Sequence, residues 1–440
     1  MKQNFFGTDG IRNTIGKFPF ELSTLPLLGK AIGKWALNKY NKSVSIILAH
    51  DTRISCSMVK SGLKSGLLLY GHTIFDAQIL PTPVVCLLTK EQDFELGIVI
   101  SASHNPYHDN GIKIITKNGK INSSDEETIQ NTYFDLINSC DTDYSLLGEE
   151  IIYYGARFYH EYLYNFFQPD YLKGLKIVLD CANGATYQLA PEIFSAFGAQ
   201  VITIHNMPDG KNINKECGSL APFLLQKKVV ETNADIGFAF DGDGDRVIAC
   251  NKNGEIKDGD DLLALLLDYK TYVHSSCIVG TVMSNQGFEN YLKEKNINFL
   301  RTKVGDKYVL ETMHQNNSLL GGEPSGHLIL KDYMNTGDGI FTALRVLQAI
   351  QQSNNWNLTT FSRYPQHIIN LPVTTKIDLT NEPITKIIQK HTNDLSSGRI
   401  IVRYSGTENI LRIMVENISL PEAKHVARQL AQSLQNEHTI

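Results

Sequence analysis

The sequence predicts an α/β protein with three related βαβ-type domains that contain mixed sheets, followed by a C-terminal α+β domain, all around a central cleft. The length of 440 residues exceeds what one hydrophobic core normally organises. An apolar run, an amphipathic segment and a second apolar run also recur three times, as in βαβ units. The expected domains are 1–155, 156–254, 255–366 and 367–440.

Each copy of the repeat begins with an apolar, β-branched run that ends in small or polar residues. These runs are SIILAHDTR from Ser45, KIVLDCANG from Lys176 and CIVGTVMSNQG from Cys277. A later apolar run in each copy (ELGIVI, ADIGFAF or SLLGG) opens into a polar loop. Because ligands of open α/β sheets bind beyond the carboxyl ends of strands, we expect these three loops to face one shared cleft.

The last segment of the chain lacks the repeat. It starts near Pro365, contains the run IIVRYSGTENILRIMVE, and ends in a helix with a capping box from Ser419 to Glu422. Apolar residues then follow helical spacing at Ala423, Val426, Ala427, Leu430 and Leu434. These features predict a small α+β domain.

The composition fits a globular protein, with 42% hydrophobic and 20% charged residues. Subtracting 46 acidic from 41 basic residues gives −5, which argues against a nucleic-acid partner. The seven cysteines are scattered without a C-x-x-C pair, which predicts reduced thiols in the cytoplasm rather than a zinc site or disulfides. No secretory signal is visible, and the longest apolar run, Leu262–Leu267, is too short to span a membrane.

The sharpest single motif is DGDGDR, which follows the apolar run IGFAF. Asp241, Asp243 and Asp245 are carboxylates on alternate residues, and the intervening glycines let the backbone bend to bring them together. Such oxygen ligands suit a hard cation, Mg²⁺ or Ca²⁺. The motif therefore predicts a metal-binding loop.

Other known loop types do not fit this motif. In an EF-hand counted from Asp241, the sixth position should be Gly but is Arg246, and the twelfth should be Glu but is Lys252. The third glycine of a dinucleotide fingerprint would fall on Val247. No G-x-x-x-x-G-K-[ST] occurs, so a P-loop nucleotide site is not supported.

The SASHNP loop offers a nucleophile or phosphate carrier at Ser103, between a strand and an Asn-Pro turn. His104 is its neighbour in sequence and therefore an awkward base, so a hydrolase triad is not favoured. Glycines do not flank the serine as they would in a nucleophile elbow.

The RYSGTENILR segment reads as an anion cradle. Arg403 and Arg412 can fork to phosphate oxygens. Ser405, Gly406 and Thr407 offer hydroxyls and accessible backbone N–H groups.

Two further polar loops complete the set of candidate site residues. In GEPSGH, Glu323, Ser325 and His327 can exchange hydrogen bonds with sugar hydroxyls, and GTDGIR places Arg12 among glycines and a carboxylate. Each loop alone could be ordinary surface structure. A metal loop, a serine loop, an anion cradle and a sugar-type loop together indicate phosphoryl transfer on a phosphorylated polyol.

These motifs resemble the α-D-phosphohexomutase family. The match runs in order along essentially the whole chain: FGTDGIR from Phe6, SASHNP, DGDGDR, GEPSGH, TGDGI from Thr336 and RYSGTEN. Within the family, the FGTDGIR opening and the TGDGI run resemble the branch that acts on glucosamine phosphate. The phosphomannomutase and phosphoglucomutase branches stay open, as do a metal-dependent phosphatase and a catalytically silent sugar-phosphate sensor.

The resemblance implies four domains around a central cleft and a phosphoserine at Ser103. It implies one Mg²⁺ per chain, held by Asp241, Asp243, Asp245 and the serine phosphate. The serine gives its phosphate to the sugar, the resulting 1,6-bisphosphate reorients, and the other phosphate returns to serine. Glucose 1,6-bisphosphate or glucosamine 1,6-bisphosphate serves as primer.

The resemblance also implies roles for the remaining site residues. Those that would surround the transferring phosphate are Arg12, His104, Lys113 and Arg246, with Lys113 the candidate general acid/base. Those that would hold sugar hydroxyls or the other phosphate are Glu323, Ser325, His327, Arg403, Ser405, Gly406, Thr407 and Arg412. Asp306 and Lys307 stand where other branches place a catalytic histidine.

The implied setting is the cytoplasm, where small sugar phosphates are the partners. The product would supply UDP-N-acetylglucosamine and peptidoglycan precursors, and the family suggests a homodimer.

Overall fold

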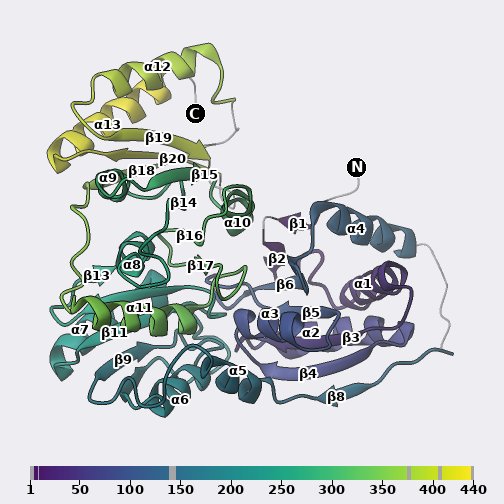
Figure 1. Cartoon of the computed structure of the whole chain (residues 1–440). Helices are drawn as coiled ribbons and strands as arrows, with labels where there is room; N and C mark the ends of the chain where they lie inside the picture. The colour runs from purple at the N-terminus through teal and green to yellow at the C-terminus, as the bar shows by residue number, and fades with distance from the viewer. Residues whose placement is uncertain (1–3, 8, 138–144, 374–377, 405–408, 438–440) are drawn as a thin grey trace.

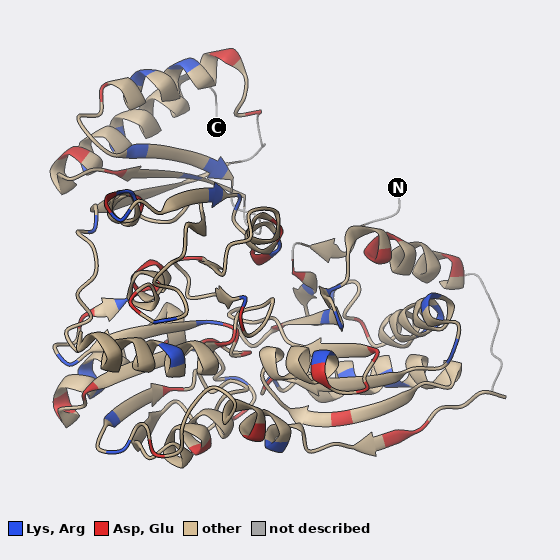
Figure 2. Ribbon diagram, viewed as in Figure 1, with Lys and Arg blue, Asp and Glu red and all other residues tan. Residues whose placement is uncertain are grey.

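The computed structural model describes residues 4–7, 9–137, 145–373, 378–404 and 409–437. Figure 1 shows three α/β units along the chain and a smaller unit at the C-terminus. Basic and acidic residues are interspersed along the ribbon of all four units (Figure 2). In the described part of the chain, no helix has the length and apolarity needed to cross a membrane.

The first unit is built on a mixed sheet in the order β1-β2-β6-β5-β3-β4-β8, with β7 beside β6. Its strands are β1 (Phe6–Gly7), β2 (Gly10–Thr14), β3 (Ser45–His50), β4 (Thr73–Ile79), β5 (Leu96–Ile100), β6 (Asp109–Thr116), β7 (Gly119–Lys120) and β8 (Glu150–Ile152). Its helices are α1 (Leu25–Tyr40), α2 (Cys56–Leu67), η1 (Leu68–Tyr70), α3 (Thr82–Glu91) and α4 (Ser123–Ile137). Strands β3 and β5 are almost wholly apolar and buried, as expected for strands that helices cover on both faces.

The second unit begins with α5 (Gly155–Leu163) and has the strand order β10-β9-β11-β12-β13. The strands are β9 (Lys176–Asp180), β10 (Gln200–Ile204), β11 (Ile236–Phe240), β12 (Val247–Asn251) and β13 (Ile256–Lys257). The helices are α6 (Leu189–Ala196), η2 (Gly218–Leu220) and α7 (Phe223–Thr232).

The third unit has the strand order β15-β14-β16-β17. Its strands are β14 (Cys277–Thr281), β15 (Asn298–Thr302), β16 (Leu320–Gly322) and β17 (Leu328–Leu330). Its helices are α8 (Gly259–Leu266), α9 (Gln286–Glu294), α10 (Asp306–Gln315) and α11 (Gly339–Ser353). A capping box formed by Asp258 and Asp261 starts α8.

The repeat predicted from the sequence is present in the sheets. Each of these three sheets contains the same arrangement, β4-β3-β5-β6, β10-β9-β11-β12 or β15-β14-β16-β17. In each one, three strands are parallel and the last is antiparallel. The serine, aspartate and Glu323 loops all join the third parallel strand to the antiparallel one, so they occupy equivalent positions.

The C-terminal unit is α+β, as predicted. Its antiparallel sheet has the order β18-β20-β19, formed by β18 (Gln366–Pro372), β19 (Arg399–Tyr404) and β20 (Ile410–Glu416). Its helices are α12 (Glu382–Asn393) and α13 (Leu420–Glu437), and the five apolar α13 positions expected in the core are all buried. The capping box is half formed, because the Glu422 carboxylate accepts hydrogen bonds from Ser396 while Glu422 N–H donates to Ser419 Oγ.

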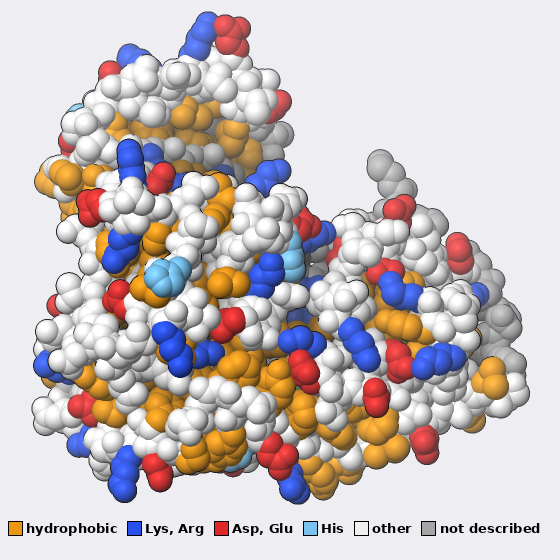
Figure 3. Space-filling view, in the orientation of Figure 1, with side chains coloured by type: hydrophobic (Ala, Val, Ile, Leu, Met, Phe, Trp, Pro, Cys, Tyr) orange, Lys and Arg blue, Asp and Glu red, His pale blue; other side chains and the backbone are white. Residues whose placement is uncertain are grey.

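The hydrophobic core joins the first three units more closely than the fourth. One apolar cluster runs from α3 of the first unit through the second and third units to α11. The C-terminal unit has a separate cluster between its sheet and α13. It meets the third unit through polar contacts, in which Arg399 donates to the carbonyl oxygens of Val282 and Ser284. Figure 3 shows the surface hollowed between this unit and the N-terminal unit.

Candidate active site

The candidate phosphate carrier, Ser103, lies in the loop after β5 and is 1% exposed. Its φ of +51° is in the left-handed region that a serine rarely adopts, so the surroundings must hold it there. Its N–H donates to Ser101 Oγ (2.9 Å), and its own Oγ donates to Asp241 Oδ2 (2.7 Å). The structure therefore brings the serine loop of the first unit against the aspartate loop of the second.

A buried ion pair that the sequence analysis missed clamps the serine loop. Arg53 and Asp51 have fully buried side chains, with Nε 2.8 Å from Oδ2. The Arg53 guanidinium donates to four backbone carbonyls of the loop, those of Ser103, Asn105, Pro106 and Asp109. Asp51 Oδ2 also accepts from Ser101 Oγ, the group that receives the Ser103 N–H.

The second unit reinforces this clamp through Asn214. Its Nδ2 donates to the carbonyls of Ser103 (2.8 Å) and Asn105 (3.2 Å). Gly242 of the aspartate loop also packs closely against the serine loop, since a Cβ at position 242 would lie 2.5 Å from the Ser103 carbonyl oxygen. The glycine is therefore required by the approach of the two loops.

The three aspartates after β11 converge as predicted. One carboxylate oxygen from each of Asp241, Asp243 and Asp245 lies within 4.8 Å of the others, and all three residues are buried. Among the described residues, Asp243 Oδ1 and Asp245 Oδ1 have no hydrogen-bond partner. Burial and the carboxylates of Asp245 and Asp243 raise the pKa of Asp241 well above its usual value. A buried carboxylate cluster with unsatisfied oxygens fits a hard divalent cation.

Lys113, on β6, lies beneath the aspartate loop and is 1% exposed. Its Nζ is 2.8 Å from Asp243 Oδ2, 3.2 Å from Asp245 Oδ2 and 3.3 Å from Asp9 Oδ2. Burial alone would lower its pKa, but Asp243, Asp9 and Asp245 together hold the pKa well above the usual value. The three carboxylates therefore favour the protonated form of Lys113, and its role as the general acid/base stays a prediction.

A network of ion pairs, which the sequence analysis did not predict, links the first and third units. Lys120 of β7 pairs with Asp9 and with Asp306, the first residue of α10. Asp9 in turn pairs with Arg12. His327 Nε2 lies 3.8 Å from Asp306 Oδ2, and its Nδ1 lies 3.6 Å from Asp245 Oδ1. Asp306, which stands where other branches of the family place a catalytic histidine, thus contributes a carboxylate to the ion pairs between the first and third units.

Several of these groups, together with residues of the neighbouring loops, line a cleft of about 610 Å³. Its lining residues come from the first three units: Asp9, Arg12, Asn13, Thr14, His104, Asn105, Asp109, Asp245, Arg246, Val304, Gly305, Asp306, Glu323 and His327. Burial, Arg246 and Arg12 lower the pKa of His104 to about 3, so its imidazole is neutral at physiological pH. Arg246 places a second guanidinium beside that of Arg12 in this lining, with its Nε 3.7 Å from Asp245 Oδ1.

The sugar-type loop after β16 borders the same cleft. Glu323 is 8% exposed, and one of its oxygens accepts from Gly305 N–H at 2.9 Å. Ser325 Oγ is buried without a hydrogen-bond partner in the part of the chain that the structure describes. Both side chains retain capacity for further hydrogen bonds.

Two arginines form the described part of the predicted anion cradle. Arg403 of β19 and Arg412 of β20 are directly paired in the sheet and line a pocket of about 250 Å³. Burial and the neighbouring Arg412 lower the pKa of Arg403. Adjacent cations on one sheet face repel each other, so an anion would stabilise them. Ser405, Gly406 and Thr407 lie outside the described residues.

The chain matches families of known proteins over almost all of its length. Four domain families of phosphoglucomutase/phosphomannomutase match: alpha/beta/alpha domain I at residues 3–138, domain II at 157–254, domain III at 258–366 and the C-terminal domain at 368–433. A phosphoglucosamine mutase of Cellvibrio japonicus is 41% identical over 440 residues, which cover 98% of each chain.

Solved structures share the fold. A phosphoglucomutase/phosphomannomutase family protein from Burkholderia thailandensis has a TM-score of 0.81 at 24% identity, covering 98% of this chain and 97% of its own. N-acetylphosphoglucosamine mutase of Aspergillus fumigatus, solved with GlcNAc-6P and magnesium, has a TM-score of 0.67 at 16% identity, covering 98% and 95%. These matches confirm the predicted four-part α/β architecture and the predicted family. The chain belongs to the phosphoglucomutase/phosphomannomutase family, the α-D-phosphohexomutases.

Proposed function

We propose that this chain interconverts glucosamine 6-phosphate and glucosamine 1-phosphate through a phosphoserine at Ser103. The observation that carries the proposal is the 2.7 Å hydrogen bond from Ser103 Oγ to Asp241 inside a buried triad of carboxylates. The sugar is chosen because the similar bacterial relatives are phosphoglucosamine mutases.

The reaction consists of two phosphoryl transfers with one turn of the sugar between them. Phosphoserine 103 loses its phosphoryl group to O1 of glucosamine 6-phosphate, which gives up the proton of that hydroxyl, and glucosamine 1,6-bisphosphate forms. The intermediate turns over in the cleft. Its 6-phosphoryl group then passes to the Ser103 oxygen, O6 regains a proton, and glucosamine 1-phosphate leaves. A sugar 1,6-bisphosphate primes an unphosphorylated chain by the second half of this cycle.

Charge determines which residues are needed around Ser103. A phosphoserine carries close to −2 and would lie beside three aspartates. Mg²⁺ held by Asp241, Asp243, Asp245 and the serine phosphate would supply the positive charge that makes this arrangement stable. The ammonium group of Lys113 compensates part of the negative charge of the same carboxylates, since its Nζ lies 2.8 Å from Asp243 Oδ2.

The remaining residues would orient the substrate. Arg12, His104 and Arg246 border the transferring phosphate, with His104 acting as a neutral hydrogen-bonding group. Glu323, Ser325 and His327 would bind sugar hydroxyls. Arg403 and Arg412, with Ser405, Gly406 and Thr407, would hold the phosphate that does not react. In this assignment domains 1–155, 156–254, 255–366 and 367–440 supply serine, metal, sugar and phosphate sites in turn.

The proposed setting is the bacterial cytoplasm, where glucosamine 1-phosphate would supply UDP-N-acetylglucosamine and peptidoglycan precursors. A homodimer is part of the same proposal. Small sugar phosphates are the expected ligands, as in the Aspergillus structure solved with GlcNAc-6P.

A comparison of substrates tests the function. Product formation from glucosamine 6-phosphate is measured beside glucose 6-phosphate and mannose 6-phosphate, with Mg²⁺ and a trace of glucose 1,6-bisphosphate. We expect strong preference for the glucosamine substrate and its loss in Ser103→Ala. Ser57→Ala, an exposed serine on α2, is the matched control and should remain active. Preference for another sugar would overturn the substrate assignment, and full activity in Ser103→Ala would overturn the mechanism.

A further inference from the structure

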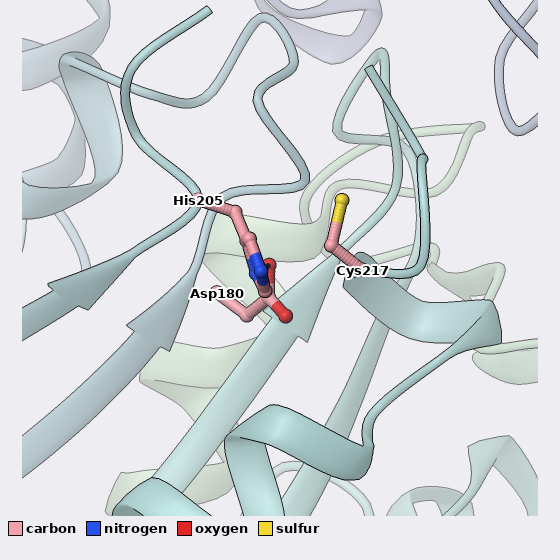
Figure 4. Close-up of side chains that lie close together, drawn as sticks. All are labelled: Asp180, His205 and Cys217. Atoms are coloured by element: carbon pink, nitrogen blue, oxygen red, sulfur yellow. Dashed lines mark ion pairs between the residues drawn. The ribbon is translucent and has the colours of Figure 1, made fainter. Parts of the chain in front are cut away.

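A second group of ligand-type side chains lies in the second unit and shares no residue with the aspartate loop. Asp180 is the last residue of β9, His205 follows β10, and Cys217 precedes η2. One ligand atom of each lies within 4.8 Å of the others. Figure 4 shows the imidazole beside the carboxylate, with the cysteine on the neighbouring loop.

The carboxylate of Asp180 is fixed in place by backbone groups. It is fully buried, its Oδ1 accepts from Ala182 N–H (2.9 Å), and its Oδ2 accepts from Gly218 N–H (3.0 Å). Each oxygen has a second acceptor direction that these bonds leave available. Backbone donors that orient a carboxylate in this way are typical of the outer layer of metal sites.

The imidazole of His205 is close to this carboxylate but poorly directed toward it. Nδ1 lies 3.0 Å from Asp180 Oδ1. The same Nδ1 is a buried atom that makes no correctly angled hydrogen bond within the described ranges. The side chain as a whole is 21% exposed, so the site lies just beneath the surface of the second unit.

We propose that Asp180, His205 and Cys217 form a binding site for a zinc-class divalent cation, with water as the fourth ligand. Imidazole nitrogen, thiolate sulfur and carboxylate oxygen form a ligand set typical of Zn²⁺, which is softer than the all-oxygen set of Asp241, Asp243 and Asp245. At zinc–ligand distances of about 2.0–2.3 Å, the ligand atoms of a tetrahedral site lie roughly 3.4–3.7 Å apart, so atoms within 4.8 Å of one another need to move inward by no more than about 1 Å. This site is separate from the proposed mutase reaction.

A cysteine nucleophile is a weaker interpretation of the same three residues. Burial and the nearby Asp180 raise the pKa of the Cys217 thiol to about 12. The residue is also only 1% exposed. Nucleophilic cysteines need a depressed pKa and access to substrate, and neither condition holds here.

Ion binding would connect two loops that support the active-site serine. The segment from His205 to Cys217 carries Asn214, whose side chain donates to the Ser103 carbonyl. The Asn214 N–H donates to the carbonyl of Ala182, which lies two residues after Asp180. A cation would therefore tie β9, β10 and this segment together.

Cobalt(II) is the probe for the test, because a cobalt–thiolate bond gives a near-ultraviolet charge-transfer absorption that oxygen ligands do not give. The full chain is titrated with Co²⁺ in excess Mg²⁺, which fills the aspartate loop. We expect one Co²⁺ with thiolate absorption, displaced by Zn²⁺. The absorption should vanish in Cys217→Ala, and affinity should fall at least about ten-fold in His205→Ala.

Cys250→Ala, which removes a buried thiol on β12, is the matched control and should keep the absorption. Absence of thiolate absorption in the wild-type chain would overturn the proposal and leave Asp180 and His205 as a simple ion pair. Absorption that persists in Cys217→Ala would also overturn it. Circular dichroism checks that Cys217→Ala folds. If that variant does not fold, His205→Ala, which changes a partly exposed side chain, still tests the proposal.

Discussion

The buried clamp of Arg53 offers the most informative single perturbation. Arg53→Ala removes the guanidinium bonds to four loop carbonyls and leaves the Asp51 carboxylate buried without its cation. Removal of one partner of a buried ion pair costs about 3–5 kcal/mol of folding stability. Release of the serine loop by about 1 Å costs on the order of 100-fold in the rate of transfer.

Arg53→Lys tests the positive charge at position 53 separately from the forked geometry of the guanidinium. Lysine keeps a cation beside Asp51 but presents only three donors from one nitrogen, so it cannot reproduce the forked contacts to the loop. We therefore expect Arg53→Lys to recover much of the stability and little of the activity. Arg157→Ala, at an exposed pair with Glu161, is the control and should change neither property.

The two readouts are the turnover rate and the unfolding of the first unit alone. The chain has two tryptophans, Trp35 and Trp356, and Trp35 is buried on α1. In a Trp356→Phe background, tryptophan fluorescence therefore follows unfolding of the N-terminal unit in urea. An Arg53→Ala variant with wild-type turnover would refute the role of the clamp, and so would an Arg53→Lys variant with full turnover.

Three further predictions follow from the site. Mg²⁺ removal by a chelator should abolish turnover more completely than Arg246→Ala, and restoring Mg²⁺ should restore it; comparable activity in excess chelator would contradict the charge argument. Gly242→Ala should lower turnover by on the order of 100-fold without unfolding the chain, because its Cβ would lie 2.5 Å from the Ser103 carbonyl oxygen; a fully active variant would refute the required loop approach. Burial raises the pKa of Asp338, the N-cap of α11, from 3.8 to about 6. The folded state therefore favours the protonated carboxyl, and this contribution to folding stability is fully present below pH 4 and is lost as the pH rises through 6. The loss is about 3 kcal/mol at about 1.36 kcal/mol per unit, and Asp338→Asn should flatten the urea midpoint across that pH window; an unchanged pH dependence would argue against the shift.

The sequence was sufficient to locate the loops of the site. A carboxylate triad on alternate residues, a serine before Asn-Pro and a repeated strand pattern are local signals, and the repeat places their loops at equivalent sheet positions. Asp241, Asp243 and Ser103 therefore meet in the structure as expected.

The supporting residues could not be found in the same way. Arg53 stands in the run SIILAHDTR, where nothing local shows that its guanidinium reaches carbonyls about fifty positions later. Lys120 and Asp306 are 186 positions apart and meet only because the first and third units pack together. The protonation of Lys113 likewise depends on Asp9 and Asp243, which come from different units. Contacts over such separations depend on tertiary packing, which residue patterns do not encode locally.

The cysteine at position 217 shows the same limit. Cysteine spacing argued against a zinc site, because none of the seven cysteines forms a C-x-x-C pair. The three side chains of the proposed site come instead from three separate segments, and folding brings them within 4.8 Å. Only the structure reveals such a group.

Transfer of labelled phosphate tests the central claim most directly. The chain is incubated with ³²P-labelled glucose 1,6-bisphosphate and Mg²⁺, the labelled peptide is identified, and unlabelled glucosamine 6-phosphate is then added. We predict that the label appears on Ser103 and passes to sugar phosphate at least as fast as the enzyme turns over. Turnover without label on Ser103, or label that stays on the serine while product forms, would contradict the phosphoserine mechanism.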